Sequence, residues 1–341
     1  MQRDFVIDVL RFSGLMLIIL AHVQPPEFIF QLRTFDVPLM IFVSGMAYGL
    51  SNVNITNYKS YLIKRCCRLI LPVWAFFLFF YIFLFCFKIN VFNHLLTTKM
   101  IASTFLLNGF GYLWIIRVFI IIALVSPFLA KLLSNKSFLF DVVIILSVVS
   151  FTTITHIYFS KPDVNKYWIM LVEDVLLPGL SYSAIFMTGY KWRCYNKEQK
   201  IKITALFGFI LTLMQLFYFK EMGYIIKPQD FKYPPTIIYL SYSIVMISAS
   251  LVLVKILTKN VIIKPNKVMS FISSNTIWIY LWHIPFVEYF KISNLSLNWC
   301  LKYLLVIIFA TLITMAQVTV IDRILVKSPK KNSLLRIIFT G

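Results

Sequence analysis

The feature that most constrains the fold of this chain is a series of long apolar stretches separated by short loops. Most of them approach or exceed the roughly 20 residues that a helix needs to cross a bilayer. Hydrophobic residues make up 60% of the 341 positions, and charged residues only 13%, about half the share of an ordinary globular domain. The mean hydropathy is +0.83. We therefore predict an all-α integral membrane protein, a single bundle of about ten transmembrane helices.

Hydropathy along the chain sets approximate bounds for these helices. An additional apolar piece near 100–108 is expected to form a re-entrant or surface helix. Neither an internal repeat nor a long linker separates the stretches, so residues 1–341 are predicted to form one transmembrane domain. The expected helices are 5–23, 36–51, 68–88, 113–131, 138–159, 175–191, 202–219, 236–257, 268–289 and 301–322.

The distribution of lysine and arginine predicts the orientation. The loops on the side that holds both termini carry twenty-one of these residues, and the opposite loops carry ten. Because cytoplasmic loops are enriched in lysine and arginine, both termini are predicted to be cytoplasmic. The net charge of +20 is spread over short loops, which favours membrane topology over nucleic-acid binding.

Five cysteines lack the spacing of a metal site or a disulfide framework, and two of them, Cys66 and Cys67, are adjacent. We expect free thiols and no bound metal.

The first apolar stretch, RFSGLMLIILAH, carries two polar groups that are unfavourable in a membrane, Arg11 and His22. Eleven residues correspond to about three helical turns, so the two side chains share one helix face about 16 Å apart. Arg11 would then lie toward the cytoplasm and His22 toward the outer side. The simpler interpretations are an ion pair between Arg11 and Asp8 and a hydrogen bond from His22 to a carbonyl oxygen. Ionisable groups within membrane spans default to functional hypotheses, and their shared face strengthens that interpretation.

At these residues the sequence resembles the membrane-bound acyltransferase family 3, whose first span carries an arginine and a histidine at this spacing. The resemblance continues in family order along nearly the whole chain. The further matching segments are FDVPLMIFVSGMAYG (35–49), KRCCRLILPVW (64–74), GYLWIIRVFIIIALVSPFL (111–129) and NTIWIYLWHIPF (275–286).

The resemblance implies transfer of an acyl group, most often acetyl, from acyl-CoA to a hydroxyl of a sugar or glycan. Such a reaction needs a base for the alcohol proton, and a neutral imidazole suits that role. The candidate catalytic residues are His22 and Arg11, with His22 either as that base or as a nucleophile that carries the acyl group. Arg65 and Arg68, three positions apart at the inner start of the third span, are candidates for binding the CoA phosphates, and Arg11 would line the path to His22.

Three further residues are candidates for the acyl or substrate site. Trp114 and Arg117 share one face of the fourth span; the tryptophan can equally belong to an interfacial belt, whereas the arginine can stabilise charge on the thioester oxygen. His283 is expected at the depth of His22, where it either assists the chemistry or makes a structural hydrogen bond. Glu173 and Asp174 either orient a histidine, bind a sugar or lie in a solvated loop.

The resulting prediction is an acyl-CoA-dependent O-acyltransferase of the bacterial cytoplasmic (inner) membrane, acting on a surface polysaccharide or its lipid-linked precursor. The alternatives are a polytopic glycan transporter or flippase, and an acyltransferase acting on a small molecule or peptidoglycan. The absence of paired broken helices in two halves argues against the transporter. Since no soluble domain is recognisable, either the membrane bundle completes the transfer or a separate extracytoplasmic partner does so.

Overall fold

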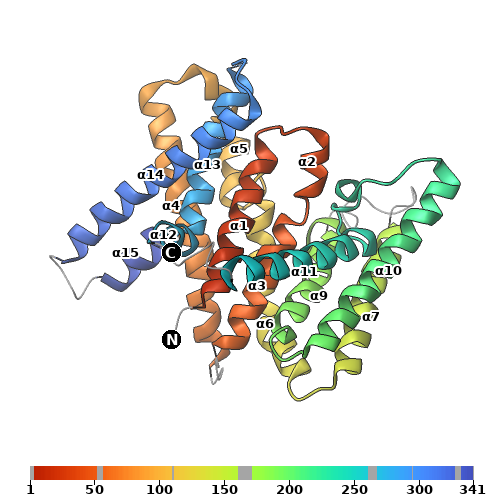
Figure 1. The fold of residues 1–341 in the computed structure, drawn as a ribbon. Coiled ribbons are helices and arrows are strands. Elements are labelled where there is room, and N and C mark those ends of the chain that lie inside the picture. The colour runs from red at the N-terminus through yellow and green to blue at the C-terminus, as the bar shows by residue number, and fades with distance from the viewer. Residues whose placement is uncertain are drawn as a thin grey trace. The chain divides into compact units, whose positions relative to one another are not determined.

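The computed structural model describes residues 4–51, 57–109, 111–159, 171–259, 267–293, 295–326 and 332–340. Every regular element within these ranges is a helix (Figure 1), which confirms the all-α prediction. Some of the cations behind the predicted orientation lie outside the described residues, so the sides of the termini stay a prediction. These cations are Arg3, Lys161, Lys166, Lys264, Lys327, Lys330 and Lys331.

The helices follow one another along the chain with short connections. A 3₁₀ segment, η1 (Asn90–Leu95), follows the long fourth helix, a π-helical turn, η2 (Val172–Leu176), leads into α9, and a second 3₁₀ segment, η3 (Pro228–Phe231), precedes α11. The α-helices are α1 (Phe5–His22), α2 (Glu27–Leu32), α3 (Asp36–Leu50), α4 (Tyr58–Phe87), α5 (Thr98–Phe105), α6 (Trp114–Leu133), α7 (Phe138–Phe159), α9 (Leu177–Lys191), α10 (Lys197–Met222), α11 (Ile237–Lys259), α12 (Lys267–Ser274), α13 (Thr276–Ile292), α14 (Trp299–Val326) and α15 (Asn332–Phe339).

Eight helical segments of the described chain are long and apolar enough to cross a membrane, so the predicted count of about ten is not confirmed. The difference lies in α9, with 15 residues, and in the expected helix 268–289. That expected helix is divided into α12 and α13 at Asn275, whose side-chain amide donates to the backbone oxygen of Phe271. A side chain that competes for helix carbonyls in this way favours a break.

A second difference concerns the third predicted span. The helix α4 begins at Tyr58 rather than near residue 68, because Asn57 caps it by accepting a hydrogen bond from the Ser60 amide. The apolar piece expected near 100–108 forms the short helix α5. The basic tail contributes α15, which was not expected as a helix.

The chain divides into two compact units. The first unit comprises Met1–Gly14, Glu27–Ile55 and Ile121–Pro265, and the second comprises Leu15–Pro26, Thr56–Ile120 and Asn266–Gly341. Each unit therefore combines segments that are distant in sequence.

In the first unit, α3 packs against α9 at two glycines. A Cβ atom on Gly45 would overlap the backbone oxygen of Phe186, and one on Gly189 would overlap that of Phe42. Only glycine permits this close approach of the two backbones. Gly45 and Gly189 thus serve helix packing.

The first unit also contains a sealed ionic cluster, which we define as Arg33, Asp36 and Lys232. Asp36, at the start of α3, accepts from Arg33 Nη1 at 2.7 Å and from Lys232 Nζ at 3.0 Å. None of the three residues is more than 3% exposed. Burial lowers the pKa of Lys232, and the carboxylate of Asp36 opposes that shift.

In the second unit, α13 packs against α14 and α4, and α15 lies beside both α14 and α4 (Figure 1). The indole of Trp278 on α13 donates to the backbone oxygen of Ile338 in α15 at 3.0 Å. The next tryptophan of α13, Trp282, donates to Gln317 of α14 at 2.9 Å. These contacts fix α13, which carries His283.

Candidate active site

His22 is the last residue of α1 and belongs to the second unit. The helix ends here because Pro25 and Pro26 follow, and a proline has no backbone N–H to continue it. Gln24, the residue directly before Pro25, has a φ of 54°, which is in the left-handed region. A non-glycine residue there is unfavourable by about 1–2 kcal/mol, and such strain is often found near functional sites.

His283 lies beside His22 in the same unit. Its ring centroid is 5.2 Å from that of His22, and its Nε2 is 3.3 Å from His22 Nδ1. The side chain is completely buried. Its other ring nitrogen, Nδ1, hydrogen-bonds the backbone oxygen of Tyr280 one turn earlier in α13. The sequence placed the two histidines at a common depth, and the structure brings their rings together.

Tyr112, just before α6, packs its ring edge against His22 with the centroids 4.7 Å apart. Its hydroxyl donates to Glu288 Oε1 at 2.5 Å and accepts from Lys291 Nζ at 2.5 Å, while Lys291 also contacts Glu288 at 2.9 Å. Burial raises the pKa of Tyr112, and the neighbouring Glu288 carboxylate raises it further. The phenol is therefore a proton donor to that carboxylate at neutral pH.

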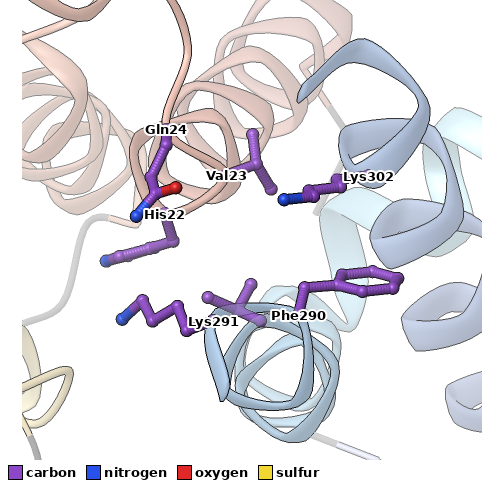
Figure 2. A pocket seen from close by; sticks show the side chains of 7 residues that line it. His22, Val23, Gln24, Phe290, Lys291 and Lys302 are labelled. Carbon is purple, nitrogen blue, oxygen red and sulfur yellow. The ribbon is translucent and has the colours of Figure 1, made fainter. Parts of the chain in front are cut away.

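A pocket opens beside His22 (Figure 2) and encloses about 230 Å³, including space open to solvent. The polar ends of Gln24, His22 and Lys291 gather on one side of it. Its lining residues come from the end of α1 and from α13 and α14, all in the second unit: His22, Val23, Gln24, Val287, Phe290, Lys291 and Lys302.

The predicted pair Trp114 and Arg117 lies at the start of α6, one turn apart as the spacing indicates. Arg117 is half-buried, and its Nε is a buried atom with no hydrogen-bond partner in the described structure. Tyr112, which packs against His22, lies two residues before the first residue of α6.

Arg65 and Arg68 lie in the second and third turns of α4, where both are exposed, and Arg65 stacks over the ring of Tyr61 at 5.7 Å. The helix α4 begins ten residues before the predicted span, at Tyr58, and the place of the two arginines at the inner start of the membrane-crossing part stays a prediction. Neither guanidinium forms an ion pair with a described residue.

The comparison with known proteins decides the family. The sequence model of acyltransferase family 3, described as an acyltransferase domain, matches residues 5–321 and therefore nearly all of the chain. The chain belongs to this family. No curated protein and no solved structure matched the chain. The resemblance of the five quoted motifs is thus confirmed, and the protein is a membrane acyltransferase.

The acyltransferase carries Arg11 in the middle of α1, half-buried and within the first unit. Since α1 is one uninterrupted helix, the eleven-residue spacing places Arg11 and His22 on one of its faces. No group of three potential metal ligands occurs among the described residues.

Sequence reasoning missed Tyr112, Glu288 and Lys291. For Glu288 a signal was available, because it is the only acidic residue between 268 and 292, and an ionisable residue in such a stretch is a functional candidate. Tyr112 gave no signal, since nothing in its loop separates it from the other seventeen tyrosines of the acyltransferase. Glu173 does contact a histidine, accepting from or donating to His156 Nδ1 at 3.1 Å in the first unit.

Proposed function

We propose that this acyltransferase transfers an acyl group, typically acetyl, from cytoplasmic acyl-CoA to a hydroxyl of a surface polysaccharide or its lipid-linked precursor. The observation that carries the proposal is His22, which lines an open pocket while its ring contacts His283. We place the protein in the bacterial cytoplasmic membrane, with the pocket facing the acceptor.

In the proposed reaction, His22 removes the proton from the acceptor hydroxyl. The hydroxyl oxygen forms a bond to the carbonyl carbon of the thioester, and the carbon–sulfur bond breaks. The departing CoA thiolate takes the proton from His22, so the products are an ester and free CoA. The buried Nε of Arg117 supports a role in stabilising charge on the thioester oxygen.

The exposed pair Arg65 and Arg68 fits the phosphates of CoA, because guanidinium groups bind phosphate with paired hydrogen bonds. Their exposure in adjacent turns of α4 leaves both accessible to an anionic substrate. Arg11, on the His22 face of α1, would accompany the pantetheine arm. The acceptor is proposed to reach His22 through the pocket that His22 lines.

The test measures transfer from radiolabelled acetyl-CoA by the purified full-length protein, with cell-envelope glycan as acceptor. His22→Ala removes the base, so we expect labelled glycan to fall by roughly 10²–10⁴-fold. The matched control is His156→Ala, a histidine of the first unit, which should keep wild-type transfer. The proposal would be refuted if wild-type protein transferred label neither to glycan nor to peptidoglycan, and released no labelled acetate by hydrolysis of acetyl-CoA.

A second experiment addresses the cell. Surface glycan from a strain that lacks the protein is compared with glycan from a strain that carries His22→Ala. Loss of the same ester group in both strains supports the acceptor class, whereas unchanged glycan esters together with altered peptidoglycan would replace it.

A further inference from the structure

We infer that His283 is a positioning residue that holds His22 in the tautomer with its proton on Nδ1, so that Nε2 is the basic nitrogen. This inference rests on the proposed function, because it assigns how the proposed base is prepared. The two tautomers of a neutral imidazole place the basic lone pair on different nitrogens. A base held in one tautomer needs no rearrangement before it accepts the substrate proton.

The argument begins at the backbone of α13. His283 Nδ1 hydrogen-bonds the carbonyl oxygen of Tyr280, and a carbonyl oxygen can only accept. His283 Nδ1 therefore carries the proton. In the neutral ring the other nitrogen, Nε2, is then an acceptor. The helix backbone thus determines which way the buried imidazole of His283 presents its lone pair.

In the second step, the acceptor role of His283 Nε2 determines the tautomer of His22. His283 Nε2 and His22 Nδ1 are 3.3 Å apart, within hydrogen-bond distance. Because His283 Nε2 is the acceptor, His22 Nδ1 must be the donor of this hydrogen bond. A histidine that ligates or reacts through one nitrogen commonly has its tautomer set by the hydrogen bond of the other. His22 accordingly carries its proton on Nδ1, and its Nε2 is the nitrogen that accepts a proton from substrate.

Tyr280 stabilises the positions of His283 and Tyr112 through two hydrogen bonds. Its carbonyl oxygen orients His283, and its hydroxyl donates to the backbone oxygen of Tyr112 at 2.5 Å. Tyr112 in turn packs edgewise against both imidazoles, with centroids 4.7 Å from His22 and 5.7 Å from His283. Among the described residues of this unit, the titratable and charged groups near His22 include Tyr112, Tyr280, His283, Glu288, Lys291 and Lys302.

The direct test is ¹⁵N NMR of full-length protein labelled in histidine, because protonated and unprotonated ring nitrogens have well-separated chemical shifts. The chain has only four histidines, so His22 can be assigned by comparison with His22→Ala. We expect a protonated Nδ1 and an unprotonated Nε2 at neutral pH. His283→Gln, whose amide oxygen also accepts, should keep this pattern, whereas His283→Leu should give a mixture of tautomers.

The activity arm follows CoA release from acetyl-CoA by the same proteins. His283→Leu should lower kcat by at least 10-fold with little change in KM for acetyl-CoA, and His283→Gln should recover much of the loss. His156→Leu is the control and should match wild type in both measurements.

Two results would overturn the inference: an active wild-type enzyme with His22 protonated on Nε2, or His283→Gln and His283→Leu with equal turnover. If His283→Leu does not fold, as judged by thermal unfolding, the wild-type tautomer and the Gln variant decide. Failure of the proposed function has a different signature. The tautomer would then be as inferred, but wild-type protein would release no CoA.

Discussion

The two units of the protein each contain a cluster of polar side chains, and the clusters differ in what surrounds them. In the first unit, the sealed ionic cluster of Arg33, Asp36 and Lys232 is at most 3% exposed, and its carboxylate accepts from both cations. In the second unit, His22 and Lys291 line an open pocket. The comparison indicates that buried charges paired with one another hold the fold, whereas polar groups beside an opening are available for chemistry.

The largest expected effect tests the sealed cluster. Asp36→Asn removes the carboxylate that both Arg33 and Lys232 contact. Removal of one partner of a buried pair typically lowers the free energy of unfolding by about 3–5 kcal/mol. Thermal unfolding in detergent measures this loss. The control is Asp230→Asn, an exposed carboxylate in η3 of the same loop region, for which we expect less than about 0.5 kcal/mol.

If Asp36→Asn instead keeps its stability and loses turnover per folded molecule, the sealed cluster takes part in function. The distinction between the two clusters would then be wrong.

An intermediate effect is expected in the pocket. Glu288→Gln retains a hydrogen-bond acceptor for Tyr112 but removes the charge partner of Lys291. We expect a roughly 10-fold lower kcat, equivalent to about 1.4 kcal/mol in the barrier, and a change in unfolding free energy below about 1 kcal/mol. Steady-state CoA release and thermal unfolding of the same preparation give the two numbers, with Glu198→Gln at the exposed start of α10 as control.

A loss of stability as large as that of Asp36→Asn, with normal turnover per folded molecule, would make Glu288 a structural residue. Both clusters would then stabilise the fold, and the proposed distinction between a structural and a functional cluster would be wrong.

The sequence predicts what depends on local pattern and not what depends on distant pairing. Helix α7 has the predicted bounds, 138–159, because hydropathy alone determines a long apolar helix. The pairing of Asp36 with Lys232, by contrast, joins residues 196 positions apart, and no periodicity indicates it. The break between α12 and α13 falls in a polar run of four residues, 273–276, inside a stretch that is apolar on average. Hydropathy averaged over that stretch predicts one helix, whereas the side-chain hydrogen bond of Asn275 favours the break.

The same distinction applies to the candidate site. His22 and His283 are visible as rare polar groups in apolar segments, which is why both were predicted. Their contact across 261 positions and the packing of Tyr112 against both rings follow only from tertiary packing.

The smallest expected effect concerns a third polar pair, which is neither sealed nor beside the pocket. Glu173 contacts His156 at 3.1 Å, and the two side chains are 26% and 29% exposed. Solvent screens such a pair, so Glu173→Gln should change the free energy of unfolding by no more than about 0.5 kcal/mol and leave CoA release at the wild-type level. A loss of turnover with intact stability would contradict this expectation. It would show that polar groups of the first unit also reach substrate, and that the chemistry is not confined to the surroundings of His22.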